Sequence, residues 1–259
     1  MHTGHSNSAN LPNVWTQLAN QYDGQDRWYL EALGIAAEGH WDECLNAWLP
    51  GVNRDSAAAR DIIWRSRSSK TPELLADIIG NPDTPEAQLP RYLRAFDYQD
   101  ASARKPHLIA MAFGNNEDHP RARLISGEAL GRLPKADVTA PDRRVALQQI
   151  VGRMRGTSDY VTLVRRLNLT EEYPGLLDLA SKNPENQIGI EATHALLTLD
   201  QYKLLYDAAN GDDIALANGI IAALVAAKDG KATGTLTDTM NNQRQPISRR
   251  SMAARGVAN

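Results

Sequence analysis

One phrase occurs twice in this sequence and constrains the fold more than any other feature. Leu74-Leu75 precedes Asn81-Pro82 by seven residues, and Leu176-Leu177 precedes Asn183-Pro184 by the same seven. The two copies lie 102 residues apart, near three units of 34, a period typical of helical repeats. Ala-Leu pairs at 129–130, 195–196 and 223–224 lie in stretches rich in small residues that permit close helix contact. We therefore predict helix pairs that bury a continuous core only when they stack.

Start and stop signals divide the chain into many short helices. Asp26 precedes large apolar residues at helical spacing, and Gly39 and Pro50-Gly51 end the helices before them. The predicted fold is all-α, a HEAT-like helical-repeat solenoid (an α-α superhelix) that forms a single domain over residues 11–259, after a flexible segment over residues 1–10. The expected helices span residues 14–22, 26–37, 40–49, 57–65, 73–79, 86–98, 103–113, 120–132, 141–154, 158–167, 174–181, 185–198, 200–209, 213–228, 236–241 and 247–258.

Three phrases in the Trp-rich part, residues 22–98, carry a family resemblance: residues 22–35 (YDGQDRWYLEALGI), 60–67 (RDIIWRSR) and 89–97 (LPRYLRAFD). Together they resemble the HEAT-repeat segment of large haem-binding proteins of the planctomycete, verrucomicrobial and Bacteroidetes type, often labelled membrane-bound dehydrogenases. In that family a sugar-dehydrogenase-like β-propeller precedes the repeats, and a cytochrome c domain follows them. The resemblance covers roughly the first hundred residues and the middle segment of that family alone.

This resemblance implies a non-catalytic scaffold, a spacer or docking segment of a larger dehydrogenase–cytochrome c-type protein. Its partners would be the neighbouring propeller and cytochrome c domains or another protein, in the periplasm or cell envelope. Haem attachment needs a Cys-x-x-Cys-His motif, and Cys44 is the single cysteine. We therefore expect no catalytic residue, no bound cofactor and no metal in this chain. The N-terminal residues lack the basic and apolar regions of a signal peptide.

Charge composition separates the scaffold hypothesis from an alternative function, DNA repair. A helical-repeat DNA glycosylase of the AlkD type would use a basic concave face, but the net charge is −3 and the isoelectric point about 6.1. Between Arg91 and Arg166 there are 14 basic and 8 acidic residues, an excess of 14 − 8 = 6, and these arginines are dispersed among the acids. Nucleic-acid binding is therefore disfavoured. No window approaches the ~20 apolar residues of a membrane span, so we expect no membrane insertion.

Few residues suggest chemistry. Glu191 and His194 have the Glu-x-x-His spacing of di-metal bundles, but a second copy is missing, so a packing or surface histidine is favoured. We expect Cys44 to be a packed thiol and His40 to cap a helix. Asn168 begins a glycosylation sequon by pattern only.

One constellation in the Trp-rich part is a candidate binding patch. Aromatic and arginine side chains there could recognise acidic groups on a partner. The alternative, which we favour, is a Trp-rich packing layer whose arginines pair with Asp23, Asp26, Asp61 and Asp97. On that interpretation Trp64→Ala would cost about 3–5 kcal/mol of stability. The candidate patch residues are Trp28, Tyr29, Trp64, Arg65, Arg67, Arg91 and Arg94.

Overall fold

The fold is all-α, as the sequence predicts. The computed structural model describes residues 10–114 and 120–258, and this part contains seventeen α-helices, several short 3₁₀ turns and no strand. Apart from Asn10, the predicted flexible segment 1–10 lies outside the described residues. Two of the predicted helices, 57–65 and 158–167, have the observed bounds, and the short helix α9 (Lys135–Val138) was not predicted.

The chain divides into two compact units, one ending at Pro134 and the other beginning at Lys135. Such a division arises in continuous repeat arrays as well as in separate domains. The single domain over residues 11–259 therefore stays a prediction.

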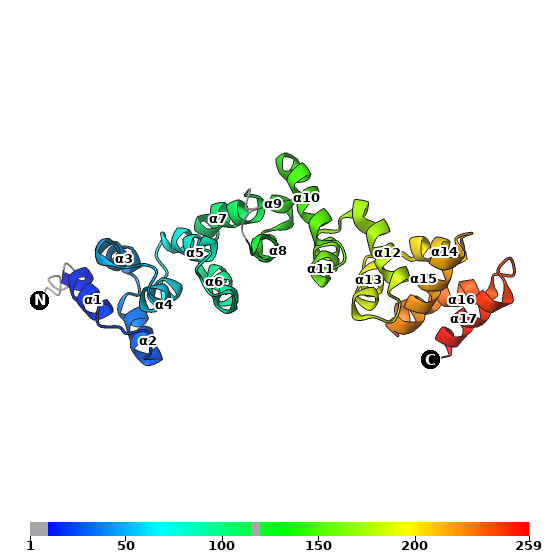
Figure 1. Ribbon diagram of the computed structural model, residues 1–259, viewed down its shortest axis with the longest axis horizontal. Coiled ribbons are helices and arrows are strands. Elements are labelled where there is room, and N and C mark those ends of the chain that lie inside the picture. Colours follow the sequence, from blue (N-terminus) through cyan, green and yellow to red (C-terminus); the bar gives the residue numbers. More distant parts are fainter. Residues whose placement is uncertain (1–9, 115–119, 259) are drawn as a thin grey trace, which may run out of the picture. The chain divides into compact units, whose positions relative to one another are not determined.

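The described residues of the first unit form helices α1 to α8 (Figure 1). Each packs against helices one or two places along the chain: α1 contacts α2 and α3, α4 contacts α5 and α6, and α5 contacts α6 and α7. This order is that of a helical-repeat fold, in which neighbours in sequence are neighbours in space. The helices are α1 (Leu11–Ala19), α2 (Arg27–Ala36), α3 (Trp41–Trp48), α4 (Ala57–Arg65), α5 (Thr71–Gly80), α6 (Leu89–Ala95), α7 (Ala101–Phe113) and α8 (Ala122–Arg132).

The second unit is similar, with contacts up to three places along the chain: α12 contacts α13 and α15, and α15 contacts α17. Its helices are α9, α10 (Arg144–Met154), α11 (Ser158–Leu167), α12 (Tyr173–Lys182), α13 (Gln187–Thr198), α14 (Tyr202–Asn210), α15 (Ile214–Ala227), α16 (Thr233–Asn241) and α17 (Ile247–Val257).

Side-chain caps fix several of the helix ends. The Asp26 carboxylate accepts from the backbone N–H groups of Trp28 and Tyr29, at 2.8 and 3.1 Å, and so begins α2. Asp213 begins α15 in the same way. At the other end of α11, Asn168 adopts the left-handed conformation with φ 54°, and its amide oxygen accepts from the Tyr173 hydroxyl. Asn168 therefore has a structural role as the residue that ends a helix.

Buried arginines make the same long-range contact in both units. Arg121, at the start of α8, donates to the carbonyls of Asn81, Pro82 and Thr84 in the loop after α5. Arg249, in the first turn of α17, donates at 2.9 Å to the Gly211 carbonyl in the loop after α14. In each unit the arginine therefore contacts the loop that follows the helix three places earlier in the chain, which is α5 for α8 and α14 for α17. This recurrence supports a repeating arrangement. The first of these loops contains the repeated Asn-Pro pair.

Small residues let helices approach closely in the second unit, as predicted. A Cβ atom on Gly219 of α15 would lie 2.3 Å from the backbone oxygen of Ser181 on α12. A Cβ on Gly189 of α13 would lie 1.8 Å from the backbone oxygen of Asn183, in the turn before that helix. These distances are too short for any side chain, so glycine is required at both positions for the backbones to pack as they do.

Candidate functional site

An aromatic cluster forms the core beneath the candidate site. Trp15 of α1 is 1% exposed and packs edge-to-face against Trp41 and Trp48 of α3, with ring centroids 5.9 and 6.2 Å apart. The indole N–H of Trp15 donates to the Leu33 carbonyl, and that of Trp48 to the Asn20 side chain. The packing interpretation is confirmed for Trp41 and Trp48. It overlooked Trp15, the centre of the cluster, because Trp15 precedes the Trp-rich part.

Trp28 behaves differently. Its side chain is 81% exposed on α2, and Ile35, seven residues later on the same helix, is 68% exposed. Residues seven apart lie on one face of a helix, and the exposed Ala32 lies between them on that face. For Trp28 the packing interpretation is wrong, because burial of the neighbouring Leu30 and Leu33 turns Trp28 towards solvent.

Trp64 belongs to a polar aromatic cluster. The Arg91 guanidinium lies 4.2 Å from the Trp64 ring centroid and forms an ion pair of 2.7 Å with Asp61. The Tyr22 hydroxyl donates to the second Asp61 oxygen at 3.1 Å, and the Tyr22 ring stacks on Tyr29. Burial and the Asp61 charge raise the pKa of Tyr22 to about 12.

The expected deep burial of Trp64 is wrong. Ile62 and Ile63 fill the core positions of α4, and Trp64, the next residue along the helix, is only partly buried. The predicted pairing of arginines with acids holds for Arg91 and Asp61, whereas Asp26 caps α2 and Asp97 pairs with Arg132 of α8.

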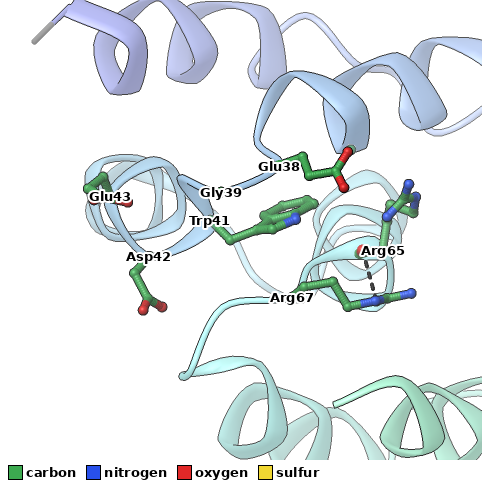
Figure 2. Close-up of a pocket in the computed structure, with 8 residues that line it drawn as sticks. Glu38, Gly39, Trp41, Asp42, Glu43, Arg65 and Arg67 are labelled. Carbon is green, nitrogen blue, oxygen red and sulfur yellow. Dashed lines mark hydrogen bonds between the residues drawn. The ribbon is translucent and has the colours of Figure 1, made fainter. Parts of the chain in front are cut away.

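A cleft of about 650 Å³ lies beside these clusters, among α2, α3, α4 and the loop after α4 (Figure 2). Its two arginines come from the end of α4 and the loop that follows. Arg65 donates from Nε to Glu31 at 2.8 Å, and Arg67 folds back to donate to the carbonyls of Arg65 and Ser66 at 2.9 and 2.6 Å. Partial burial, together with the nearby charge of Arg65, lowers the pKa of Arg67. The lining residues are Gly34, Glu38, Gly39, Trp41, Asp42, Glu43, Arg65 and Arg67.

Asp42 fixes one wall of the cleft. One of its oxygens accepts from the Ser68 hydroxyl at 2.6 Å and from the backbone N–H and hydroxyl of Ser69 at 2.7 and 3.0 Å. These hydrogen bonds to the charged form lower the pKa of Asp42. They also tie the loop after α4 to the first turn of α3, so both arginines are held on a fixed frame.

His40 precedes α3, but its side chain makes no capping hydrogen bond. The predicted capping role is therefore wrong. The first turn of α3, which lines the cleft through Trp41, Asp42 and Glu43, has no side-chain cap.

The predicted patch is distributed over several places in the first unit. Arg65 and Arg67 line the cleft, whereas Trp64, Arg91 and Tyr29 belong to the polar aromatic cluster. Trp28 lies on the outer face of α2, and Arg94 is exposed on α6. Among the other lining residues, sequence reasoning missed Gly34, Glu38, Gly39, Asp42 and Glu43. These residues lie around Gly39, between the end of α2 and the start of α3, which lacks a side-chain cap. This helix boundary was the signal that could have indicated them.

The remaining sequence candidates have structural surroundings. Cys44 is fully buried, which raises the pKa of its thiol, so the packed-thiol prediction is confirmed. His194 contacts Asp229 through Nδ1 at 3.1 Å, and Glu191 accepts from Gln187. Within residues 10–114 and 120–258, no three potential ligands of the His, Cys, Asp and Glu types cluster as a metal site would require.

Comparison with known proteins leaves the site to be interpreted from its own geometry. No protein-family model matches the sequence, and no curated protein shows significant similarity to it. Among the described helices, none is both long and apolar enough to cross a membrane.

Proposed function

We propose that this chain is a non-catalytic interaction module whose first unit docks a protein partner through the outer face of α2 and the adjoining cleft. The observation that carries the proposal is the exposure of Trp28, 81%, on a well-formed helix whose other face packs in the core. Large aromatic side chains left in water are unusual outside interaction surfaces, where tryptophan is enriched among the residues that dominate binding.

The surroundings of Trp28 support docking. Ile35 extends the apolar face of α2 by two turns. Glu31 and Gly34 lie on the side of the same helix that borders the cleft, where Glu31 pairs with Arg65, and Glu38 follows in the turn after the helix. An apolar stripe edged by charged groups resembles the core and rim of a protein interface.

By resemblance to the haem-binding dehydrogenase family, the partner proposed for this surface is a propeller dehydrogenase or cytochrome c-type domain. The module would then set the spacing of redox domains without carrying redox chemistry itself. The HEAT-like repeat assignment is part of this proposal and is supported by the recurring buried-arginine contact.

Site-specific photocrosslinking in cells of the source organism tests the proposal. A photoreactive phenylalanine analogue replaces Trp28, and the matched control carries it at Ile214, which is 68% exposed on α15 of the second unit. We expect position 28 to capture a propeller or cytochrome c-type polypeptide, and Ile35→Glu to abolish the capture. Equal labelling at the two positions would contradict the docking surface.

DNA binding is the other arm of the test. A glycosylase would retain duplex DNA with a steep salt dependence, whereas the three carboxylates of the cleft predict no retention. Salt-sensitive retention of duplex DNA together with excision of a damaged base would replace the scaffold proposal by the glycosylase alternative.

A further inference from the structure

The cleft contains an unused hydrogen-bond donor on a side chain that is otherwise buried. Trp41 is 8% exposed, and its indole N–H donates to no described residue, whereas those of Trp15 and Trp48 are both satisfied. Figure 2 shows the indole nitrogen of Trp41 facing the space bordered by Glu38, Arg65 and Arg67. A tryptophan N–H usually finds an acceptor when the ring is buried, and this N–H is open to the cleft, where an acceptor from outside the chain can reach it.

The two arginines add donors to the same space. Arg65 uses Nε for Glu31, and Arg67 uses one terminal nitrogen for the carbonyls at the end of α4. Each guanidinium carries five N–H donors, so both keep further donors for a ligand. Together these groups match the two oxygens of a carboxylate.

Acceptors lie beside these donors. Glu38 and Glu43 line the cleft, and neither side-chain carboxylate forms a hydrogen bond or ion pair with another described residue. A ligand that brings only negative charge would therefore meet repulsion. A doubly charged phosphate fits the cleft less well than a carboxylate that has a cationic group next to it.

We propose that the cleft binds an acidic side chain of the partner segment, with its carboxylate on the Trp41 indole N–H, Arg65 and Arg67, and an adjacent basic side chain on Glu38 and Glu43. This inference rests on the proposed docking function and names the chemistry of the docked segment. On α2, Gly34 of the cleft directly precedes Ile35 of the face that carries Trp28, and successive residues turn by about 100° around a helix. One segment can therefore contact both.

The test is an NMR titration of the full-length, ¹⁵N-labelled chain, in which the indole N–H signals report directly. The probe is the blocked dipeptide acetyl-Lys-Glu-amide at millimolar concentrations, and its matched control is acetyl-Lys-Gln-amide, which has the same shape without the carboxylate. We expect a saturable shift of the Trp41 indole signal with the first peptide and none with the second. The buried Trp48 indole signal should stay in place. No shift, or equal shifts with both peptides, would overturn the proposal.

Two variants separate binding from folding. Arg67→Gln should weaken the glutamate peptide at least about tenfold, and Arg94→Gln, at an exposed arginine of α6 outside the cleft, should leave the affinity unchanged. Trp41→Phe identifies the indole signal and keeps an aromatic ring beside Trp15 while removing the N–H. Followed through the backbone amides of Asp42 and Glu43, it should weaken binding several-fold. An unchanged affinity in Trp41→Phe would refute the assigned donor.

The two proposals fail separately. Capture from position 28 without a response to the glutamate peptide would leave the docking function standing and remove the carboxylate site. A response to the peptide without specific capture would leave a carboxylate site that the docking function does not explain.

Discussion

The close approach of α15 to α12 gives a sharp prediction for Gly219→Ala. The added Cβ would lie 2.3 Å from the backbone oxygen of Ser181 and 2.9 Å from its carbonyl carbon and Cα. Non-bonded carbon atoms are most stable at about 3.5–4.0 Å. Because the obstructing atoms belong to the backbone of α12, no side-chain rotation can relieve the overlap, and the two helices must separate.

The magnitude follows from two opposing effects. Overpacking a tight contact costs about 1–3 kcal/mol, and replacing glycine by alanine inside a helix returns about 0.5–1 kcal/mol. We expect a net loss of about 1–2 kcal/mol in the free energy of unfolding. For a chain of this size that loss corresponds to a decrease in Tm of about 2–8 °C.

The matched control is Gly152→Ala on α10 of the same unit. Gly152 is exposed, and a Cβ there would meet no atom within 4 Å, so only the helix-propensity gain should appear. Urea unfolding followed by far-UV circular dichroism measures both variants. If Gly219→Ala were as stable as the parent chain while Gly152→Ala gained stability, the tight α12–α15 packing would be refuted.

Three further predictions concern the first unit. Trp15→Ala should cost about 3–5 kcal/mol of stability because it empties the centre of the aromatic cluster, whereas Trp28→Ala should change stability by less than about 0.5 kcal/mol. Equal losses of stability for the two variants in urea unfolding would contradict the assigned burial. Trp64→Ala should cost about 1–2 kcal/mol, because the side chain is half-buried and the main loss is the contact with the Arg91 guanidinium. A loss of stability as large as that of Trp15→Ala in the same urea assay would contradict this prediction. Folding raises the pKa of Tyr22 to about 12. The stabilisation that this shift gives the folded state is complete below the unfolded pKa of about 10 and is lost as pH rises through 12. The urea midpoint of Tyr22→Phe should therefore fall less between pH 10 and 12 than that of the parent chain, and parallel falls would contradict the shift.

Local signals in the sequence determined the class of fold. Caps such as Asp26 and stops such as Pro50-Gly51 act within a few residues, so they can be recognised without knowledge of the fold, and the all-α prediction is confirmed. The repeated Asn-Pro phrase marked a loop that the structure shows to be held by the buried Arg121. The stretch of small residues around the Ala-Leu pair at 223–224 likewise predicted close helix contact, and Gly219 of the same helix makes such a contact.

The candidate site could be predicted only in part. Arg65 and Arg67 were recognised as binding candidates from their neighbourhood in the sequence, but the walls of the cleft were not. Gly34 comes from α2, Trp41 from α3 and Arg65 from α4, and only the tertiary structure brings them together around the cleft. The split of the predicted patch has the same origin, since adjacent residues such as Trp64 and Arg65 point in directions about 100° apart on a helix.

Tertiary packing also decided which tryptophans are buried. Composition favours burial for all of them, because each carries a large apolar ring. Trp15, Trp41 and Trp48 meet across α1 and α3 and exclude water from one another. Trp28 lies on α2 with Leu30 and Leu33 already filling the core side of that helix, so its ring remains in solvent. The sequence by itself determined that these helices form, and the order in which they pack decided which of their faces became core and which became surface.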